Sequence, residues 1–367
     1  GVMSRLADLI NELCPDGVEY KSLGEVAELK RGQSITKKSI TPGDIPVIAG
    51  GRKPAYFTSS ANRTGMTIVV AGSGAYAGFV SYWDQPIFVS DAFSVKVNEE
   101  ILVPRFTYHW MCGKQKELYS LKSGGGVPHV YPKDVAKFKC PIPPLEVQCE
   151  IVRILDQFTT LEAELEAELE ARQAQYEYYR EQLLSYDSIV ARCSGEVKYR
   201  SLGDLIRIRN GRDYKMLSSG TVPVYGSGGV MTHVSEAIGV GPTVLIPRKG
   251  SLDNIFFVEG PFWTVDTIFY TEIGSEIDPK YLYYNLKKMR LSQMNEAAGV
   301  PSMNQRKLNR IQIPLPSLEE QRRIADILDR FDALVNDISS GLPAEIAARR
   351  AQYEYYRDRL LSFLEKK

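Results

Sequence analysis

Basic and amide side chains with the chemistry to bind nucleic acid follow two Gly-Val-Pro tripeptides, at 126–128 and 299–301. Asn, Gln and Arg can form paired hydrogen bonds with base edges, whereas Lys and Arg neutralise phosphates. Glycine and proline make such a loop rigid, so we expect base contacts here first, although these could also be ordinary solvated loop residues. This first set of candidates is His129, Tyr131, Lys133, Ser302, Asn304, Gln305, Arg306 and Lys307.

Two further sets of polar residues occupy corresponding places in the two halves of the chain. They could hold phosphates as well as read bases, and some could do neither. The second set is Lys30, Arg31, Gln33, Lys37 and Lys38, matched by Arg207, Arg209, Asn210, Arg212 and Lys215. The third set is Arg52, Lys53 and Arg63, matched by Arg248, Lys249 and Asn254.

The sequence offers little support for catalysis or metal binding. The glycine-rich run 71–78, AGSGAYAG, is followed by the strand-like FVSYW rather than by a helix, so it is interpreted as a β-turn connection and not as a dinucleotide loop. The chain contains no Asn/Asp-Pro-Pro-Tyr/Phe motif of adenine methylation and no GxxxxGK[ST] phosphate loop. Five scattered cysteines and three histidines form no CxxC or clustered set, so we expect reduced thiols and no zinc site.

Charge and hydropathy point to two mildly basic bodies. The formal net charge is zero, but residues 17–143 carry +6, residues 195–316 carry +4 and residues 145–187 carry −8. Basic bodies are compatible with surfaces that face phosphates, although excesses this small are weak evidence alone. No apolar run approaches the ~20 residues of a membrane span, and the start of the sequence has no secretory pattern, so a cytoplasmic protein is expected.

The strongest feature of the sequence is an internal duplication. PIPPLEVQCEIVRILDQF (141–158) matches PLPSLEEQRRIADILDRF (314–331), and RQAQYEYYREQLLSY (172–186) matches RRAQYEYYRDRLLSF (349–363). VEYKSLGEVAELKRG (18–32) likewise matches VKYRSLGDLIRIRNG (197–211). The matches run in the same order in both halves, with offsets of 173 to 179 residues. This period is too long for a solenoid, so a domain followed by a helix is used twice and a pseudo-two-fold molecule is expected.

Each repeat begins with a mixed α/β globular part. Val, Ile, Phe and Tyr runs punctuated by Gly, Pro and Asp predict strands, and apolar residues at helical spacing after a proline predict helices at 104–121 and 279–295. The predicted strands are 67–71, 78–83, 87–89, 93–97, 243–247, 254–258, 262–265 and 268–271.

A long helix follows each globular part. Its apolar seam residues follow a heptad pattern, which is interrupted once by two successive four-residue steps at Leu161, Leu165 and Leu169. Arg172 is the one charged residue in this seam. From Leu145 to Tyr186 the helix would be ~63 Å long. Such a seam needs a partner, and we expect antiparallel pairing with the other copy's helix, which would put the two globular parts at opposite ends of a rod. Pairing with other chains is the alternative. The seam residues are Ile151, Ile154, Phe158, Leu161, Leu165, Leu169, Arg172, Tyr176, Tyr179, Leu183 and Tyr186, then Ile324, Ile327, Phe331, Leu334, Ile338, Tyr353, Tyr356, Leu360 and Phe363.

The tyrosines of the Tyr-Glu-Tyr-Tyr runs are interpreted as seam residues rather than stacking platforms. In the second copy, Gly341 and Pro343 should break or kink the helix. The predicted division is therefore a first globular domain with a short lead-in at 1–143, a spacer helix at 144–188, a second globular domain at 189–316, and a second helix at 317–367 that is kinked near 341–343.

Together these motifs resemble the specificity subunits of type I restriction-modification enzymes. The resemblance rests on P-[IL]-P-x-L-E-x-Q-x-x-I-x-x-[IL]-L-D-x-F, on A-Q-Y-E-Y-Y-R-[ED]-x-L-L-S-[YF] and on the entry C-P-D-G-V-E-Y-K-[ST]-L-G-E-V, and both halves carry every part in order. It implies an α+β fold with two pseudo-symmetric mixed α/β target recognition domains, separated by long helices that pair as an antiparallel coiled coil.

The resemblance also implies a non-catalytic role in a larger enzyme. Each recognition domain would read one half of a bipartite target in double-stranded DNA, with the helices setting the gap between the half-sites. The helices would recruit two modification (methyltransferase) subunits, and restriction (translocase and nuclease) subunits would join them. By the same resemblance this subunit binds no cofactor; S-adenosylmethionine belongs to the modification subunits, and ATP and magnesium to the restriction subunits. The alternatives are a standalone specificity component of another restriction-modification class, or a protein scaffold that does not bind DNA.

Overall fold

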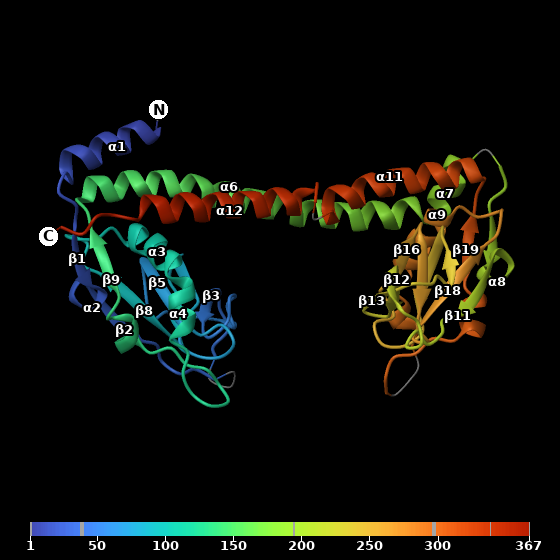
Figure 1. Cartoon of the computed structure of the whole chain (residues 1–367), viewed down its shortest axis with the longest axis horizontal. Helices are drawn as coiled ribbons and strands as arrows, with labels where there is room; N and C mark the ends of the chain where they lie inside the picture. Colours follow the sequence, from blue (N-terminus) through green and yellow to red (C-terminus); the bar gives the residue numbers. More distant parts are fainter. Residues whose placement is uncertain (1, 37–39, 194, 296–298, 338, 367) are drawn as a thin grey trace. The chain divides into compact units, whose positions relative to one another are not determined.

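The computed structural model describes residues 2–36, 40–193, 195–295, 299–337 and 339–366. The chain forms two compact units, a first unit of Gly1–Glu166 and Ile346–Lys367 and a second unit of Ala167–Glu345. Each unit combines one globular part with segments of both long helices (Figure 1). The candidates Lys37 and Lys38, and Ile338 of the seam, lie outside the described residues.

In the first unit, a four-stranded antiparallel sheet with the order β2-β8-β5-β6 forms the centre of the globular part. The helix α3 packs against β5, β6 and β8, and a smaller sheet, β4-β3-β7, and the pair β1-β9 complete it. The strands are β1 (Glu19–Ser22), β2 (Ala27–Arg31), β3 (Ile45–Ile48), β4 (Tyr56–Thr58), β5 (Met66–Ala71), β6 (Val80–Asp84), β7 (Phe88–Val89), β8 (Ala92–Val97) and β9 (Lys139–Ile142). The short helices are α1 (Val2–Leu13), α2 (Leu23–Val26), α3 (Pro104–Gly113), α4 (Gln115–Ser120) and α5 (Pro132–Val135).

The second unit repeats this arrangement. Its large sheet has the order β11-β18-β15-β16, its smaller sheet the order β13-β12-β17-β14, and β10 pairs with β19. The strands are β10 (Lys198–Ser201), β11 (Ile206–Asn210), β12 (Ser219–Gly226), β13 (Gly229–Val234), β14 (Gly239–Val240), β15 (Thr243–Pro247), β16 (Phe256–Val258), β17 (Pro261–Thr264), β18 (Ile268–Ile273) and β19 (Gln312–Leu315). The helices are α7 (Tyr186–Arg192), α8 (Leu202–Leu205), α9 (Pro279–Lys288), the 3-10 helix η2 (Leu291–Met294) and α10 (Gln305–Asn309).

The predicted strands of the large sheets are confirmed, with shifts at their ends, but both predicted helices were too long. The prediction for 104–121 was wrong at Lys114, which separates α3 from α4. The prediction for 279–295 was wrong after Lys288, because Arg290 adopts a left-handed conformation with φ 47° that an α-helix does not accommodate. The strand predicted at 254–258 begins only at Phe256, since a turn occupies the residues before it.

The long helices are α6 (Leu145–Leu183), α11 (Leu318–Asn336) and α12 (Leu342–Leu360). In the first unit α12 runs antiparallel to α6, with the Phe158 and Tyr356 rings stacked 5.3 Å apart and Arg350 bonded to Glu162 and Glu166. In the second unit α11 pairs with α6, and the rings of Tyr179 and Phe331 stack 5.5 Å apart. The predicted pairing within one chain is therefore confirmed in each unit.

Only part of the predicted seam is buried. Tyr176 and Tyr353, the first tyrosines of the two Tyr-Glu-Tyr-Tyr runs, are core residues, whereas Tyr179 is exposed apart from its stacking contact. Leu161 is also exposed. Arg172 bonds to Gln175 and Glu168 along its own helix, which explains how a charged residue can occupy a seam position.

One buried glutamine in each unit joins a long helix to the globular part. Gln148, at the start of α6, accepts a hydrogen bond from the backbone N–H of Val103 at 2.8 Å and donates to the carbonyls of Ile101 and Pro143. Val103 is the N-cap residue of α3. A single side chain thus satisfies three backbone groups and fixes the start of the long helix against α3.

Gln321 does the same at the start of α11. It accepts from the N–H of Asp278 at 2.8 Å and donates to the carbonyls of Glu276 and Pro316. Asp278 is the N-cap residue of α9. The glutamine of the P-x-L-E-x-Q pattern therefore has the same structural role in both units.

An aspartate eight residues further along each long helix, about two helical turns, makes a second connection. Asp156 accepts hydrogen bonds from Arg105 at 2.7 Å and His109 at 2.8 Å. In the second unit, Asp329 accepts from Lys280 and from the Tyr284 hydroxyl. The acceptor is the same in both units but the donors differ, so the two helix junctions are alike in position and different in chemistry.

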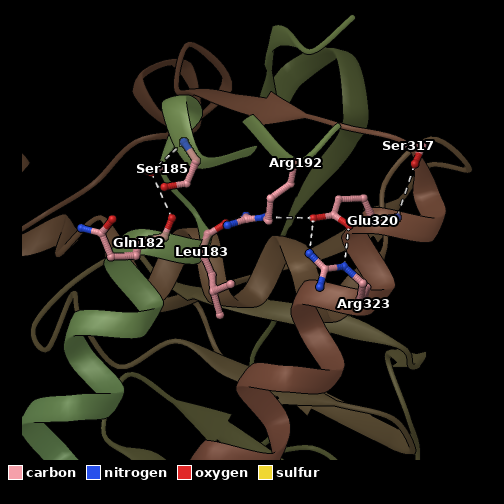
Figure 2. Close-up of polar contacts among 8 residues, drawn as sticks. Gln182, Leu183, Ser185, Arg192, Ser317, Glu320 and Arg323 are labelled. Atoms are coloured by element: carbon pink, nitrogen blue, oxygen red, sulfur yellow. Dashed lines mark hydrogen bonds and ion pairs between the residues drawn. The ribbon is translucent and has the colours of Figure 1, made fainter. Parts of the chain in front are cut away.

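Figure 2 shows a further junction, within the second unit, that fixes α7 between the end of α6 and the start of α11. Arg192 donates to the carbonyl of Leu183 at 2.8 Å and to Glu320 at 3.3 Å. Arg323 bonds both oxygens of Glu320, at 2.7 and 2.8 Å, and Ser317 caps the helix by accepting from the N–H of Glu320. The two arginines, Arg323 above all, lower the pKa of the Glu320 carboxyl below its usual value.

Candidate nucleic-acid interface

In the first unit, the loop after the first Gly-Val-Pro tripeptide is held against the end of β5. Gly74 donates its N–H to the carbonyl of Pro128 at 2.9 Å, and Val130 donates to the carbonyl of Gly72 at 3.0 Å. His129 forms isolated bridges with Ser73 and, across its own loop, with Ser123. The loop is therefore built on a backbone frame and not on side chains alone.

The second unit holds its loop by corresponding contacts. Gly250 donates to the carbonyl of Pro301 at 3.0 Å, Met303 donates to the carbonyl of Arg248 at 2.8 Å, and Lys249 forms an isolated bridge with Ser302. Gly74 and Gly250 have φ values of 83° and 82°, a conformation that favours glycine over other residues. The first and third sets of candidates thus meet along one backbone frame in this unit.

The second set joins the first set at the ends of β2 and β11. In the first unit the Arg31 guanidinium lies 5.7 Å from the centre of the Tyr131 ring, and so does the Lys133 ammonium. The rings of His129 and Tyr131 are stacked 6.1 Å apart. In the second unit the Gln305 amide donates to the Asn210 side-chain oxygen at 3.2 Å. We refer to these two surfaces as the first and second loop faces.

A close approach of the backbone after β2 and β11 explains two glycines in these faces. A Cβ atom on Gly32 would lie 2.2 Å from the carbonyl oxygen of Ser90, and one on Gly211 would lie 2.0 Å from that of Val265. Only glycine fits at either position without a shift of the backbone. The exposed side chains that follow, Gln33 and Arg212, are placed by this contact.

A hollow of about 510 Å³ lies within the first loop face. Arg31, Tyr56, Asp91, His129 and Tyr131 contribute to its lining. Asp91 accepts a hydrogen bond from the Ser73 hydroxyl, so its charge is partly satisfied within the protein. The hollow combines a cation, aromatic surfaces and polar groups, which suits a partly exposed base or sugar-phosphate better than an apolar ligand.

Two arginines of the third set, Arg52 and Arg63, differ in what their side chains contact. Arg52 is exposed and packs over the rings of Tyr76 and Phe79, at 5.0 and 5.5 Å. Arg63 instead bonds to Ser94 and to backbone carbonyls, including that of Arg31. The Arg63 side chain is thus part of the internal structure.

Several other candidates also have partners within the protein. Arg209 forms a bidentate pair with Glu272 at 3.0 and 3.1 Å, and Glu272 raises the pKa of Arg209. Asn304 accepts from the N–H of Lys307 and so caps α10, and the Lys307 ammonium bonds to the carbonyl of Met294. Arg248 lies over the Phe269 ring. Other exposed candidates include Lys30, Gln33, Lys53, Lys133, Arg207, Arg212, Lys215, Lys249 and Arg306.

The hairpin between β12 and β13 was missed by the sequence analysis. The Asn254 amide donates to the carbonyl of Ser227 at 3.0 Å, and this turn lies next to Gly250 of the second loop face. Val230 and Met231, which follow the turn, are exposed. The run Gly226-Ser-Gly-Gly229 is a hairpin signal that could have indicated this turn.

Neither a metal site nor a membrane span is found in the part of the chain that the structure describes. Its histidine, cysteine, aspartate and glutamate side chains form no group of three suited to a metal ion. Its helices include none that is both long and apolar enough to cross a membrane.

Comparison with known proteins agrees with the two-unit architecture. The family described as Type I restriction modification DNA specificity domain matches residues 15–171 and 194–348. The EcoR124I/EcoR124II specificity subunit of Escherichia coli is 31% identical, over 98% of this chain and 98% of its own length. The EcoprrI specificity subunit of the same species is 34% identical, over 92% and 93%. The crystal structure of a type I system S subunit from M. genitalium has a TM-score of 0.65 at 21% identity and covers 94% of this chain and 96% of its own, which shows a shared fold.

The chain therefore belongs to the type I restriction modification DNA specificity domain family. It is the DNA sequence-specificity subunit of a type I restriction-modification system and a non-catalytic component of it.

Proposed function

We propose that the chain reads a bipartite target in double-stranded DNA, one half-site through each loop face. The observation that carries this proposal is the pair of equivalent backbone frames with different side chains. Tyr131 and Asn304 are both N-cap residues of short helices at the same place in the fold, and His129 corresponds to Ser302. Different side chains on the same frame are what two different half-sites would require.

The long helices, in this proposal, bind two modification subunits, and restriction subunits join that complex. The acidic stretch of α6 from Glu162 to Glu170 would repel phosphates, so it faces protein or solvent rather than DNA. S-adenosylmethionine acts in the modification subunits, and ATP and magnesium act in the restriction subunits, with the whole enzyme in the cytoplasm. The recognition domains are residues 1–143 and 189–316, and the helices are residues 144–188 and 317–367.

The test is to coexpress the chain with its cognate modification subunit and to map methylated adenines across a genome. One bipartite motif with a fixed spacer is the expected result. A stable complex and an intact methyltransferase that leave no motif would contradict the proposal, because the loop faces would then not read DNA. Salt-dependent binding of the complex to duplex DNA separates this function from that of a protein scaffold.

A further inference from the structure

The Gly-Val-Pro tripeptides of both loops carry an exposed aliphatic side chain. Val127 is 54% exposed and Val300 is 70% exposed. Each valine precedes the proline whose carbonyl accepts a hydrogen bond from Gly74 or Gly250. One exposed valine would need no explanation, but the same exposed residue at the same place in two units does.

The first of these loops holds its valine in a defined place. Ser123 and His129 exchange backbone hydrogen bonds at 3.0 and 2.9 Å, and the His129 ring nitrogen lies 2.8 Å from the carbonyl of Val127. Pro128 restricts the backbone of the valine before it to extended conformations. A side chain held in this way loses little conformational freedom when it contacts a surface.

Each loop also projects away from the protein partners expected on the long helices. In the first unit the teal-green loop between α4 and α5 lies at the end of the unit opposite α6 and α12, and in the second unit the orange loop before α10 lies at the end opposite α6 and α11 (Figure 1). The neighbours of the two valines differ, with His129 and Tyr131 in one unit and Ser302 and Asn304 in the other. A residue that is the same in both units is suited to contact a feature that both half-sites share. Both half-sites share the shape of the duplex, whereas their base sequences differ.

We propose that Val127 and Val300 act as apolar wedges that enter a DNA groove and partly unstack one base step beside each half-site. Aliphatic side chains unstack base steps in this way in proteins that kink DNA. Methylation of an adenine requires that the base leave the stack, so loosening a step nearby would ease that event for the partner methyltransferase. The inference rests on the proposed function, because it needs the loop faces to lie on DNA.

The test uses the complex of the full chain with its modification subunits and a duplex that carries the mapped target. The variants Val127→Thr and Val300→Thr replace one methyl group by a hydroxyl while keeping the β-branched shape before proline. 2-Aminopurine is placed in turn at positions within and beside each half-site, avoiding the methylated adenines. The parent complex is expected to raise fluorescence at one step beside each half-site.

Each threonine variant should reduce that rise at least about threefold at its own half-site alone and weaken binding about tenfold, as expected when an aliphatic contact is lost. The letters of the target should stay the same. Unchanged 2-aminopurine signals, in a complex whose DNA binding still weakens on Lys133→Ala, would overturn the wedge and leave the proposed function intact. Failure of all these variants to alter DNA binding would overturn both. Loss of complex assembly in the threonine variants, measured by native mass spectrometry, would also overturn the wedge, because the valines would then contact protein.

Discussion

The Nδ1 atom of His109 lies 2.8 Å from the hydroxyl oxygen of Tyr353, although 244 residues separate them in the chain. His109 belongs to α3 and Tyr353 to α12, and the other ring nitrogen of His109 bonds to Asp156 of α6. One buried imidazole thus connects the recognition-domain helix of the first unit to both long helices. In the second unit the corresponding position is Tyr284, which does not titrate near neutral pH.

The first prediction is that the first unit loses stability as the pH falls below about 7. Burial above all lowers the pKa of His109, despite the opposing effect of Asp156. The unfolded histidine therefore binds a proton at a higher pH than the folded one, and stability falls as the pH drops below its unfolded pKa of about 6.5. The pKa of Asp156 is also lowered, so its contribution is lost at still lower pH, in the same direction.

The measurement is urea unfolding of the full chain between pH 7.5 and pH 5. His109→Gln keeps an amide able to bond to both partners but does not titrate, so the decline of stability with falling pH should become smaller. His233→Gln, at an exposed position of the second unit, serves as the control and should leave the decline unchanged. A decline that is equally steep in His109→Gln would contradict the assignment.

The second prediction concerns the buried glutamines. Gln321→Leu should lower the free energy of unfolding of the second unit by about 2–4 kcal/mol, because it removes the hydrogen-bond partner of three backbone groups, among them the carbonyl of the buried Pro316. Gln148→Leu should have the same effect on the first unit. The exposed Gln157→Leu on α6 is the matched control and should change stability by less than about 0.5 kcal/mol. Equal losses in control and test variants would show that leucine itself, and not the lost hydrogen bonds, is responsible.

The sequence predicted the duplicated plan, the long helices and three of the four strands of each large sheet because each has a strong local pattern, but it missed the edge strands β2 and β11. It missed β1, β9 and their counterparts, since these four-residue strands lack the alternation of a longer strand. The long helix was predicted to Tyr186, but it ends at Leu183, and α7 begins under the cap of Ser185. Ser185 is a local signal for a new helix start, but the apolar spacing continues to Tyr186 and therefore predicted one uninterrupted helix.

The contacts that join α3 and α9 to the long helices, and those made by Arg63, could not be predicted from the sequence. The donors to Asp156 and Asp329 differ in type between the units, and only the packing of α3 and α9 brings them to the same acceptor. Arg63 was grouped with possible phosphate contacts because it is basic, yet its guanidinium bonds to four groups of the protein. A single sequence does not distinguish such an internal arginine from one at a surface.

The third prediction is that exposed cations of the loop faces contribute to the salt dependence of DNA binding. Lys133→Ala and Arg306→Ala should each weaken binding uniformly across sequences and lower the slope of log K against log salt by about 0.9, the value for one phosphate contact. Lys116→Ala, an equally exposed lysine on α4, should leave the slope unchanged. Fluorescence anisotropy of the complex at several salt concentrations measures this. A slope that falls as much with Lys116→Ala would indicate a general effect of net charge and not a contact.

The last prediction assigns each half-site to one unit. Gln305 and Asn210 orient each other by a hydrogen bond of 3.2 Å and leave amide groups able to pair with an adenine edge. Gln305→Ala should therefore relax one position of the second half-site, with a loss of discrimination of about 1–3 kcal/mol, and leave the letters of the first half-site unchanged. Gln33→Ala in the first loop face is the reciprocal variant, expected to affect only the first half-site. Adenine methylation mapping with each variant gives the result directly, since the motif is recovered one position at a time. If Gln305→Ala relaxed positions in both half-sites, the two loop faces would not read their half-sites independently. Their equivalent backbone frames would then contact one shared part of the target.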